Sequence, residues 1–295
     1  MRVLVAGSTG YLGKHIVRQV KERGHEVRAL VHDPGRLKPV RAMTDEVFTA
    51  DATDPDALRD CCDGVDAVIS AIGLVGWKSK QTCWDVDYGA NRNLLLEAGR
   101  AGVGKFVYSS VVHAPALEGL QLVRAKRAFE QELRDSGLPY TILFPNGFFS
   151  DFDIYLSMAR KGRVYVFGDG GFRINPVDGA DVATAAAEAL GAGSSEVELG
   201  GPEILTHEQI ARQAFHALGT PPRITRIPAA LLKTSAALLR RLTPLRVHGV
   251  IEFPITVLTH DVISPTTGDH NLAEHYRQVA TPGLTGDGIR PADRR

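Results

Sequence analysis

Three glycines near the start of the chain, Gly7, Gly10 and Gly13, follow one another at three-residue steps. Glycines at such positions permit a tight turn, let the backbone approach a phosphate group and let a helix pack closely on a strand. This spacing is typical of backbone N–H groups that bind a pyrophosphate at the start of a helix. We therefore predict a dinucleotide-binding turn, and its cofactor-binding residues are Gly7, Ser8, Thr9, Gly10, Tyr11, Leu12 and Gly13.

The predicted elements on either side of this turn support its interpretation as a dinucleotide-binding turn. Residues 2–6 form a short apolar run rich in valine and leucine, which predicts a buried strand. Residues 12–23 place apolar side chains at positions 12, 16, 17 and 20, which lie on one face of a helix. Strand, turn and helix thus occur in the order that a dinucleotide-binding turn requires.

The same alternation continues along the chain. We predict strands at 2–6, 26–32, 47–50, 66–72, 104–109 and 140–144, and helices at 12–23, 55–62, 86–101 and 122–136. Apolar strands that alternate with helices indicate an α/β fold, a Rossmann-type doubly wound parallel sheet, followed by a smaller C-terminal substrate-binding cap. The predicted domains are 1–147 for the NAD(P)-binding domain, with 172–192 packing back on it, 148–280 for the cap, and 281–295 for a flexible tail.

The composition limits the partners. With 34 basic and 34 acidic residues and a formal net charge of +0, the chain is not expected to bind nucleic acid through a broad basic surface. No signal peptide or 18-residue apolar stretch is expected. Three cysteines (Cys61, Cys62 and Cys83) make a disulfide framework unlikely and fit a reducing cytoplasm, and a metal site at Cys61 and Cys62 is improbable without a second pair. Residues 228–243 predict an amphipathic helix of the cap or of a homodimer, and a membrane-surface role stays a weaker alternative.

Charged residues after the second and third predicted strands extend the cofactor site. His32, Arg36 and Lys38 are cations that can meet a 2′-phosphate. Asp33 could instead hydrogen-bond the bare ribose of NAD(H), but Pro34 is expected to turn it outward. The sequence therefore predicts NADP(H) in preference to NAD(H).

The ends of the third and fourth predicted strands carry residues for the rest of the nucleotide. Asp51, followed by Ala52, can accept a hydrogen bond from the adenine amino group, and Asp54 is expected to cap the helix over 55–62. The small residues Ala71, Ile72 and Gly73 let the backbone approach the ribose.

Aromatic residues gather in the segments that follow the fourth and sixth predicted strands: Trp77, Trp84, Phe144, Phe148 and Phe149. They indicate a flat, hydrophobic small-molecule substrate such as a quinone or a conjugated or aromatic compound, although some are expected to belong to the core. His113 and Tyr108 are candidate acids; we expect Tyr108 to pack inside its strand, which favours His113. Asn146 either orients the substrate or caps a turn.

The motifs "GSTGYLGKHIV", "VRALVHDPGRL", "DATD" and "VDAVISAIG", together with "DYGANRNL", "FVYSS" and "FPNGFF", resemble those of atypical short-chain dehydrogenases. The likeness covers residues 1–190. Within this family, the chain most resembles the NmrA-like and isoflavone-reductase-like branch. The resemblance implies cofactor contacts from Ser109, Lys126, Pro145, Asn146 and Phe148, and a catalytic serine near Ser110.

The family's usual chemistry uses a tyrosine acid and a lysine four residues later on one helix face. Here Lys126 is present, but Leu122 stands at the tyrosine position. The resemblance then implies either a reductase in which Lys126 acts directly, helped by Ser110 and His113, or a non-catalytic NAD(P)H-binding redox sensor or assembly protein. An epimerase or dehydratase is less favoured, because those enzymes generally need the missing tyrosine.

Overall fold

The computed structural model describes residues 1–74 and 79–281. Contacts within the chain divide it into two compact units. The first unit comprises Met1–Val111, Gly119–Phe144 and Val182–Val197, and the second comprises Val112–Glu118, Pro145–Asp181 and the chain from Glu198 onward. Of the segment 172–192, only the part from Val182 belongs to the first unit.

A seven-stranded sheet with the order β3-β2-β1-β4-β5-β6-β9 runs through the fold. Neighbouring strands from β3 to β6 pair in parallel, and Ala6 of β1 lies opposite both Leu30 of β2 and Ser70 of β4. The predicted Rossmann-type doubly wound sheet is therefore confirmed. Its strands are β1 (Arg2–Ala6), β2 (Glu26–Val31), β3 (Glu46–Thr49), β4 (Ala67–Ser70), β5 (Lys105–Ser109), β6 (Tyr140–Pro145) and β9 (Ser195–Leu199).

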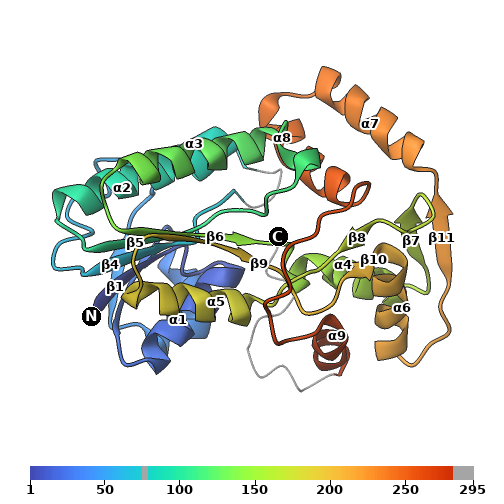
Figure 1. Cartoon of the computed structure of the whole chain (residues 1–295), viewed down its shortest axis with the longest axis horizontal. Helices are drawn as coiled ribbons and strands as arrows, with labels where there is room; N and C mark the ends of the chain where they lie inside the picture. Colours follow the sequence, from blue (N-terminus) through green and yellow to red (C-terminus); the bar gives the residue numbers. More distant parts are fainter. Residues whose placement is uncertain (75–78, 282–295) are drawn as a thin grey trace. The chain divides into compact units, whose positions relative to one another are not determined.

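Helices cover both faces of this sheet (Figure 1). Helices α1 (Tyr11–Glu22) and α5 (Gly179–Glu188) lie on one face, and α2 (Asn91–Arg100) and α3 (Gln121–Asp135) lie on the other. The apolar residues of the strands alternate between the two helix layers and are almost fully buried; Leu4, Val68 and Phe106 belong to the α2–α3 side. The order of parallel strands brings the carboxyl ends of β1, β4 and β5 to one edge, where ligands bind in open α/β sheets.

The predicted helix over 55–62 is wrong. This segment is a run of turns in which backbone N–H groups donate to carbonyls three residues earlier, as Cys61 does to Leu58 and Asp63 does to Asp60. Asp60 has a φ of +66°, which no right-handed helix accommodates. Asp54 accepts from the N–H of Asp56 at 3.0 Å, so it caps a turn rather than a helix.

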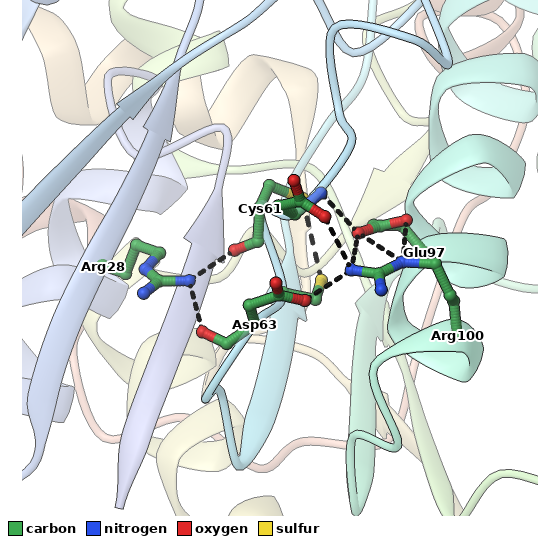
Figure 2. A network of polar contacts seen from close by, with 7 residues as sticks. Arg28, Cys61, Asp63, Glu97 and Arg100 are labelled. Atoms are coloured by element: carbon green, nitrogen blue, oxygen red, sulfur yellow. Dashed lines mark hydrogen bonds and ion pairs between the residues drawn. The ribbon is translucent and has the colours of Figure 1, made fainter.

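Two arginines from neighbouring elements fix these turns (Figure 2). The buried Arg28 of β2 donates to the carbonyl oxygens of Cys61 and Asp63, both at 2.8 Å. Arg100 of α2 donates to Glu97 at 2.9 Å and pairs with the Asp63 carboxylate. The segment that follows Asp51 is thus held by side chains instead of helical hydrogen bonds.

The predicted helix over 86–101 has an unexpected first half. Its first turns form a π-helix, η2 (Trp84–Ala90), which continues directly into α2. Single π-turns of this kind are rare and are often found at functional sites.

The second unit contains short sheets and helices. Strands β8 (Arg173–Ile174) and β10 (Leu205–Thr206) pair antiparallel, and β7 (Val164–Phe167) and β11 (Ile224–Ile227) pair in parallel. Its α-helices are α4 (Phe149–Arg160), α6 (His207–Ala217), α7 (Ala229–Leu242), α8 (Leu245–Val257) and α9 (Leu272–Ala280). The predicted helix over 228–243 therefore exists. Among the described residues, the 3₁₀ segments are η1 (Pro34–Met43), η3 (Pro115–Leu117) and η4 (Ala189–Gly191). Within the described part of the chain, no helix has both the length and the apolar character needed to span a membrane.

Candidate active site

The turn between β1 and α1 has the geometry of an anion-binding turn. Gly7 has a φ of +78°, a left-handed conformation that other residues rarely adopt. Gly10 is the N-cap of α1, and its N–H donates to the Gly7 carbonyl at 2.9 Å. A Cβ on Gly13 would lie 2.0 Å from the same carbonyl oxygen, so a side chain there would displace the helix. These three positions fit a pyrophosphate bound at a helix N-terminus.

The segment after β4 lies directly against this turn. A Cβ on Gly7 would be 2.8 Å from the carbonyl oxygen of Ala71 and 3.2 Å from the amide nitrogen of Ile72. The buried Ser8 hydroxyl donates to the Leu30 carbonyl at 3.2 Å, which connects the turn to β2 as well. The structure therefore brings the glycine turn and the predicted ribose-facing residues together.

Asp51 lies half-buried after β3, and its carboxylate is ordered by Thr53. The Thr53 amide and hydroxyl donate to Asp51 Oδ1 at 2.9 and 2.7 Å and hold the pKa of Asp51 below its usual value. His32 Nδ1 is 3.9 Å from Oδ2, and the neighbouring Ala52 carbonyl accepts from Asn93 at 3.2 Å. An ionised carboxylate held in this way fits the role of acceptor for an adenine amino group.

The loop after β2 exposes three basic side chains, His32, Arg36 and Lys38. Asp33 is the N-cap of η1, where its Oδ1 accepts from the Gly35 amide at 2.9 Å. Oδ1 of Asp33 is thus hydrogen-bonded to backbone, whereas the three basic side chains are exposed to solvent. This arrangement suits a 2′-phosphate.

Lys126 of α3 is buried in an ion pair. Its Nζ lies 3.1 Å from Oδ1 of Asp87, which belongs to η2. A Cβ on Gly73 would be 3.1 Å from that same Oδ1 and 3.6 Å from Lys126 Nζ, so the pair lies against the end of the Ala71–Gly73 segment. Lys126 thus lies beside predicted cofactor-binding backbone. Asp87 could not be identified as a site residue from the sequence, because 39 positions separate it from Lys126.

Tyr108 of β5 is the second partner of Lys126. Its hydroxyl is 3.4 Å from Nζ, and the ammonium lies 5.4 Å from the centre of its ring. The ring also packs edge-on against Phe129 at 4.6 Å between centroids, so Tyr108 is a core residue as well. Burial raises the pKa of Tyr108 to about 12.

These contacts determine the protonation of Lys126. Burial alone would lower the pKa of its ammonium, but Tyr108 and Asp87 outweigh burial and raise that pKa. The raised pKa of Tyr108 keeps its phenol neutral at neutral pH, so the ion pair of Lys126 is the one with Asp87. Lys126 is therefore a fixed cation that stabilises negative charge better than it releases a proton.

Ser110 makes a different contact from the one the resemblance implies. Its hydroxyl donates to the fully buried carboxylate of Glu130, which also pairs with Arg127 and lies 3.5 Å from Arg134. Ser109, just before it, ends β5 and is buried. Glu130 lies one helical turn after Lys126, a spacing that could have pointed to it.

The remaining predicted site residues, His113, Pro145, Asn146 and Phe148, belong to the second unit. The His113 side chain is exposed. Asn146 is buried and donates to Asn175 at 2.8 Å and to the Val262 carbonyl at 3.0 Å, so its side chain supports the fold of that unit. The catalytic role assigned to His113 and the cofactor contacts assigned to Pro145, Asn146 and Phe148 stay predictions.

The predicted aromatic residues have different environments. Phe144 is buried beneath the Arg127 guanidinium, 5.4 Å from its ring centre, and Phe149 is buried at the start of α4. Trp84 is half-buried and donates to Gln121 at 3.1 Å. Trp77 lies outside the described residues.

Known proteins share this architecture. The model of a family described as NAD(P)H-binding matches residues 7–192, more than half of the chain. The divinyl chlorophyllide a 8-vinyl-reductase of Oryza sativa subsp. indica is 29% identical, with 96% of this chain and 80% of that protein covered. A photosystem II assembly factor of Synechocystis is 34% identical, but the match covers 50% of this chain and 45% of that protein.

Among solved structures, the triphenylmethane reductase of Citrobacter sp. in complex with NADP(H) has a TM-score of 0.73 and 19% identity. That match covers 95% of this chain and all of the reductase. It supports the fold. The chain belongs to the NAD(P)H-binding family.

Proposed function

We propose that this chain is an NADPH-dependent reductase of a hydrophobic small molecule with a conjugated, aromatic or quinone-type acceptor. The observation that carries the proposal is the buried Lys126 cation beside Gly73, on the same segment that lies against the Gly7 turn. This arrangement places a fixed positive charge next to predicted cofactor-binding backbone. A relative that is a vinyl reductase and a structural neighbour that binds NADP(H) agree with it.

Each residue then has a defined task. The Gly7–Gly13 turn binds the pyrophosphate, Asp51 accepts from the adenine, and His32 and Arg36 meet the 2′-phosphate. NADPH supplies a hydride when bound. The Lys126 ammonium binds the ribose and stabilises the negative charge that an electron-poor acceptor gains on reduction. The balancing proton comes from water, because Lys126 retains its own.

The test is NADPH oxidation by the purified protein with a panel of quinones and conjugated enones. We expect turnover with at least one acceptor, and a loss of about 100-fold in kcat/KM for Lys126→Met, because removing one charge-stabilising group has an effect of this order. Lys161→Met, which removes an exposed lysine after α4, is the matched control and is expected to retain full activity. Unchanged turnover in Lys126→Met would exclude the proposed role of this residue.

A second function, a non-catalytic redox sensor or assembly protein, is favoured by one observation. Leu122, at the position of the usual acid, is half-buried in the first turn of α3 and has no titratable group. The similarity to a photosystem II assembly factor agrees with this alternative. It predicts tight NADPH binding with no turnover across the whole panel, and weaker binding in Lys126→Ala.

We also propose a reducing, cytoplasmic setting and a homodimer. The three thiols are free and buried, and burial raises the pKa of Cys83 to about 11, so it is a poor nucleophile. Leu231 and Leu242 of α7 are 61% and 73% exposed and share one helix face, which suits a second copy of the chain. Analytical ultracentrifugation tests the dimer, and Leu231→Glu with Leu242→Glu is expected to shift it to a monomer.

A further inference from the structure

Asp87 is a buried carboxylate whose two oxygens have different tasks. Only 1% of its side chain is exposed. Oδ2 accepts from the Leu74 amide at 3.2 Å, and Oδ1 lies 3.1 Å from Lys126 Nζ. Apart from this ion pair, Oδ1 has no hydrogen-bond donor among the described residues. An ionised group this deeply buried is costly unless it is paired, so the ammonium of Lys126 accounts for its charge.

The π-helix determines where this carboxylate lies. Asn91 follows Asp87 by one turn and donates to the Asp87 carbonyl at 2.9 Å. The Asn91 side chain also accepts from the Ser70 hydroxyl at 2.5 Å and lies 3.4 Å from the Ile72 carbonyl. The junction of η2 and α2 is therefore bonded to the end of β4 and to the segment after it. These hydrogen bonds fix the position of Asp87 relative to the end of β4.

A purely structural ion pair is the alternative explanation. Such pairs contribute little net stability, because desolvation offsets the attraction, and apolar residues often replace them without loss. This pair lies at the end of the Ala71–Gly73 segment, where any Cβ on Gly73 would crowd Asp87 Oδ1. Its position at the predicted ribose-binding backbone favours a role in the site.

We propose that Asp87 is a positioning residue that keeps the Lys126 ammonium charged and in place for the cofactor. The inference rests on the proposed function for the identity of the ligand, whereas its chemistry rests on the contacts of Lys126 alone. The groups that face Lys126 are Asp87 from η2 and Tyr108 from β5, with Glu130 one turn further along α3 near Tyr108. Of these, only Asp87 places a carboxylate within ion-pair distance of Nζ.

The test compares Asp87→Asn with Asp85→Asn in the full chain. Asp85 is exposed on the same π-helix, where it accepts from Thr82, so its substitution is the matched control. Two quantities are measured: the dissociation constant for NADPH by fluorescence, and the pH midpoint for acetylation of Lys126 by mass spectrometry. We expect Asp87→Asn to weaken NADPH binding about tenfold and to lower the midpoint by about one pH unit or more, because an opposite charge at this distance shifts a pKa by that amount. Asp85→Asn should change neither.

A double-variant cycle separates positioning from folding. If Asp87 acts through Lys126, Asp87→Asn should weaken NADPH binding in the wild-type background but not in a Lys126→Met background, where the pair is already absent. The double variant carries no unpaired buried charge, so its free energy of unfolding, compared with that of each single variant, shows how much of any loss of stability comes from the unpaired partner. Equal losses of NADPH affinity in both backgrounds, or an unchanged acetylation midpoint in Asp87→Asn, would overturn the proposal.

The outcomes also separate this inference from the proposed function. A wild-type protein that binds NADPH but reduces no acceptor, while its Lys126 midpoint responds to Asp87→Asn, contradicts the reductase and supports the positioning role. A wild-type protein that turns over acceptors, with Asp87→Asn indistinguishable from it in both quantities, supports the reductase and contradicts the positioning role.

Discussion

Gly13, in the first turn of α1, lies so close to Gly7 that a methyl group on it would be 2.0 Å from the Gly7 carbonyl oxygen. The same carbonyl accepts the hydrogen bond from Gly10 that closes the turn. The carbonyl oxygen of Gly7 thus lies close to both of the other glycines, Gly10 and Gly13. Close packing of the turn against the helix therefore requires this spacing of glycines, whether or not a ligand is bound.

Gly13→Ala should therefore separate the start of α1 from the turn. We expect a loss of about 1 to 3 kcal/mol in the free energy of unfolding, the usual cost of overpacking. NADPH affinity should fall at least about tenfold, because the N–H groups of the helix start would move with it. Denaturant unfolding and cofactor titration measure the two effects.

Gly99→Ala is the control for this prediction. Gly99 lies inside α2, and a Cβ there would have no atom within 4 Å. Alanine should stabilise this helix by up to about 1 kcal/mol and leave NADPH binding unchanged. Equal effects of the two substitutions would show that the contact between Gly13 and Gly7 is unimportant.

The preference for NADPH over NADH should depend on Arg36. Its guanidinium is exposed in the loop after β2, where Asp33, three residues earlier, is bonded to backbone. Arg36→Gln removes a cation that suits a 2′-phosphate, so we expect NADPH affinity to fall about tenfold or more, as for one charged hydrogen bond. NADH, which lacks that phosphate, is the internal control, and equal losses for both cofactors would exclude this role.

The strands and most helices of the Rossmann-type sheet could be predicted from the sequence, because their apolar residues repeat with clear periods. The predicted helix over 12–23 and α1, Tyr11–Glu22, differ by a single residue at each end. The glycine turn could also be predicted, because its function depends on spacing along the chain. Both are local properties.

Properties that depend on tertiary structure could not be predicted in this way. The turns over 55–62 depend on Arg28 and Arg100, which lie far away in sequence. The π-helix over Trp84–Ala90 has nearly the apolar pattern of an α-helix, so periodicity does not distinguish the two. The pairing of Asp87 with Lys126 joins two motifs whose separation carries no pattern of its own.

Arg28 should be essential for the turns that follow Asp51. It pairs with Glu46 at 2.8 Å and donates to two backbone carbonyls, and its side chain is only 8% exposed. Arg28→Met should reduce the free energy of unfolding by about 2 to 3 kcal/mol, because buried acceptors would lose a charged donor.

Arg59→Met is the matched control in the same segment. Arg59 pairs with Asp56 across three residues, and both side chains are largely exposed. We expect a change within about 0.5 kcal/mol, as is usual for exposed ion pairs. Thermal or denaturant unfolding compares the two variants, and a similar loss in both would mean that Arg28 is no more important than a surface arginine.

His270 should make the stability of the second unit depend on pH. Its Nδ1 lies 2.7 Å from Oδ1 of Asp181, and the amides of Asp269 and His270 donate to the other oxygen of that carboxylate. Burial alone would lower the pKa of His270, but Asp181, with smaller contributions from Asp178 and Asp269, raises it above its usual value near 6.5.

A histidine whose pKa is higher in the folded state stabilises that state only while it is protonated. The contribution is therefore complete below about pH 6.5, the unfolded value, and is lost as the pH rises through the folded value above it. It should be modest, because the His270 side chain is 60% exposed. Unfolding measured between pH 5.5 and 8.5 should show this loss in the wild type and a flatter profile in both His270→Gln and Asp181→Asn. A profile that keeps its slope in both variants would assign the pH dependence to another group.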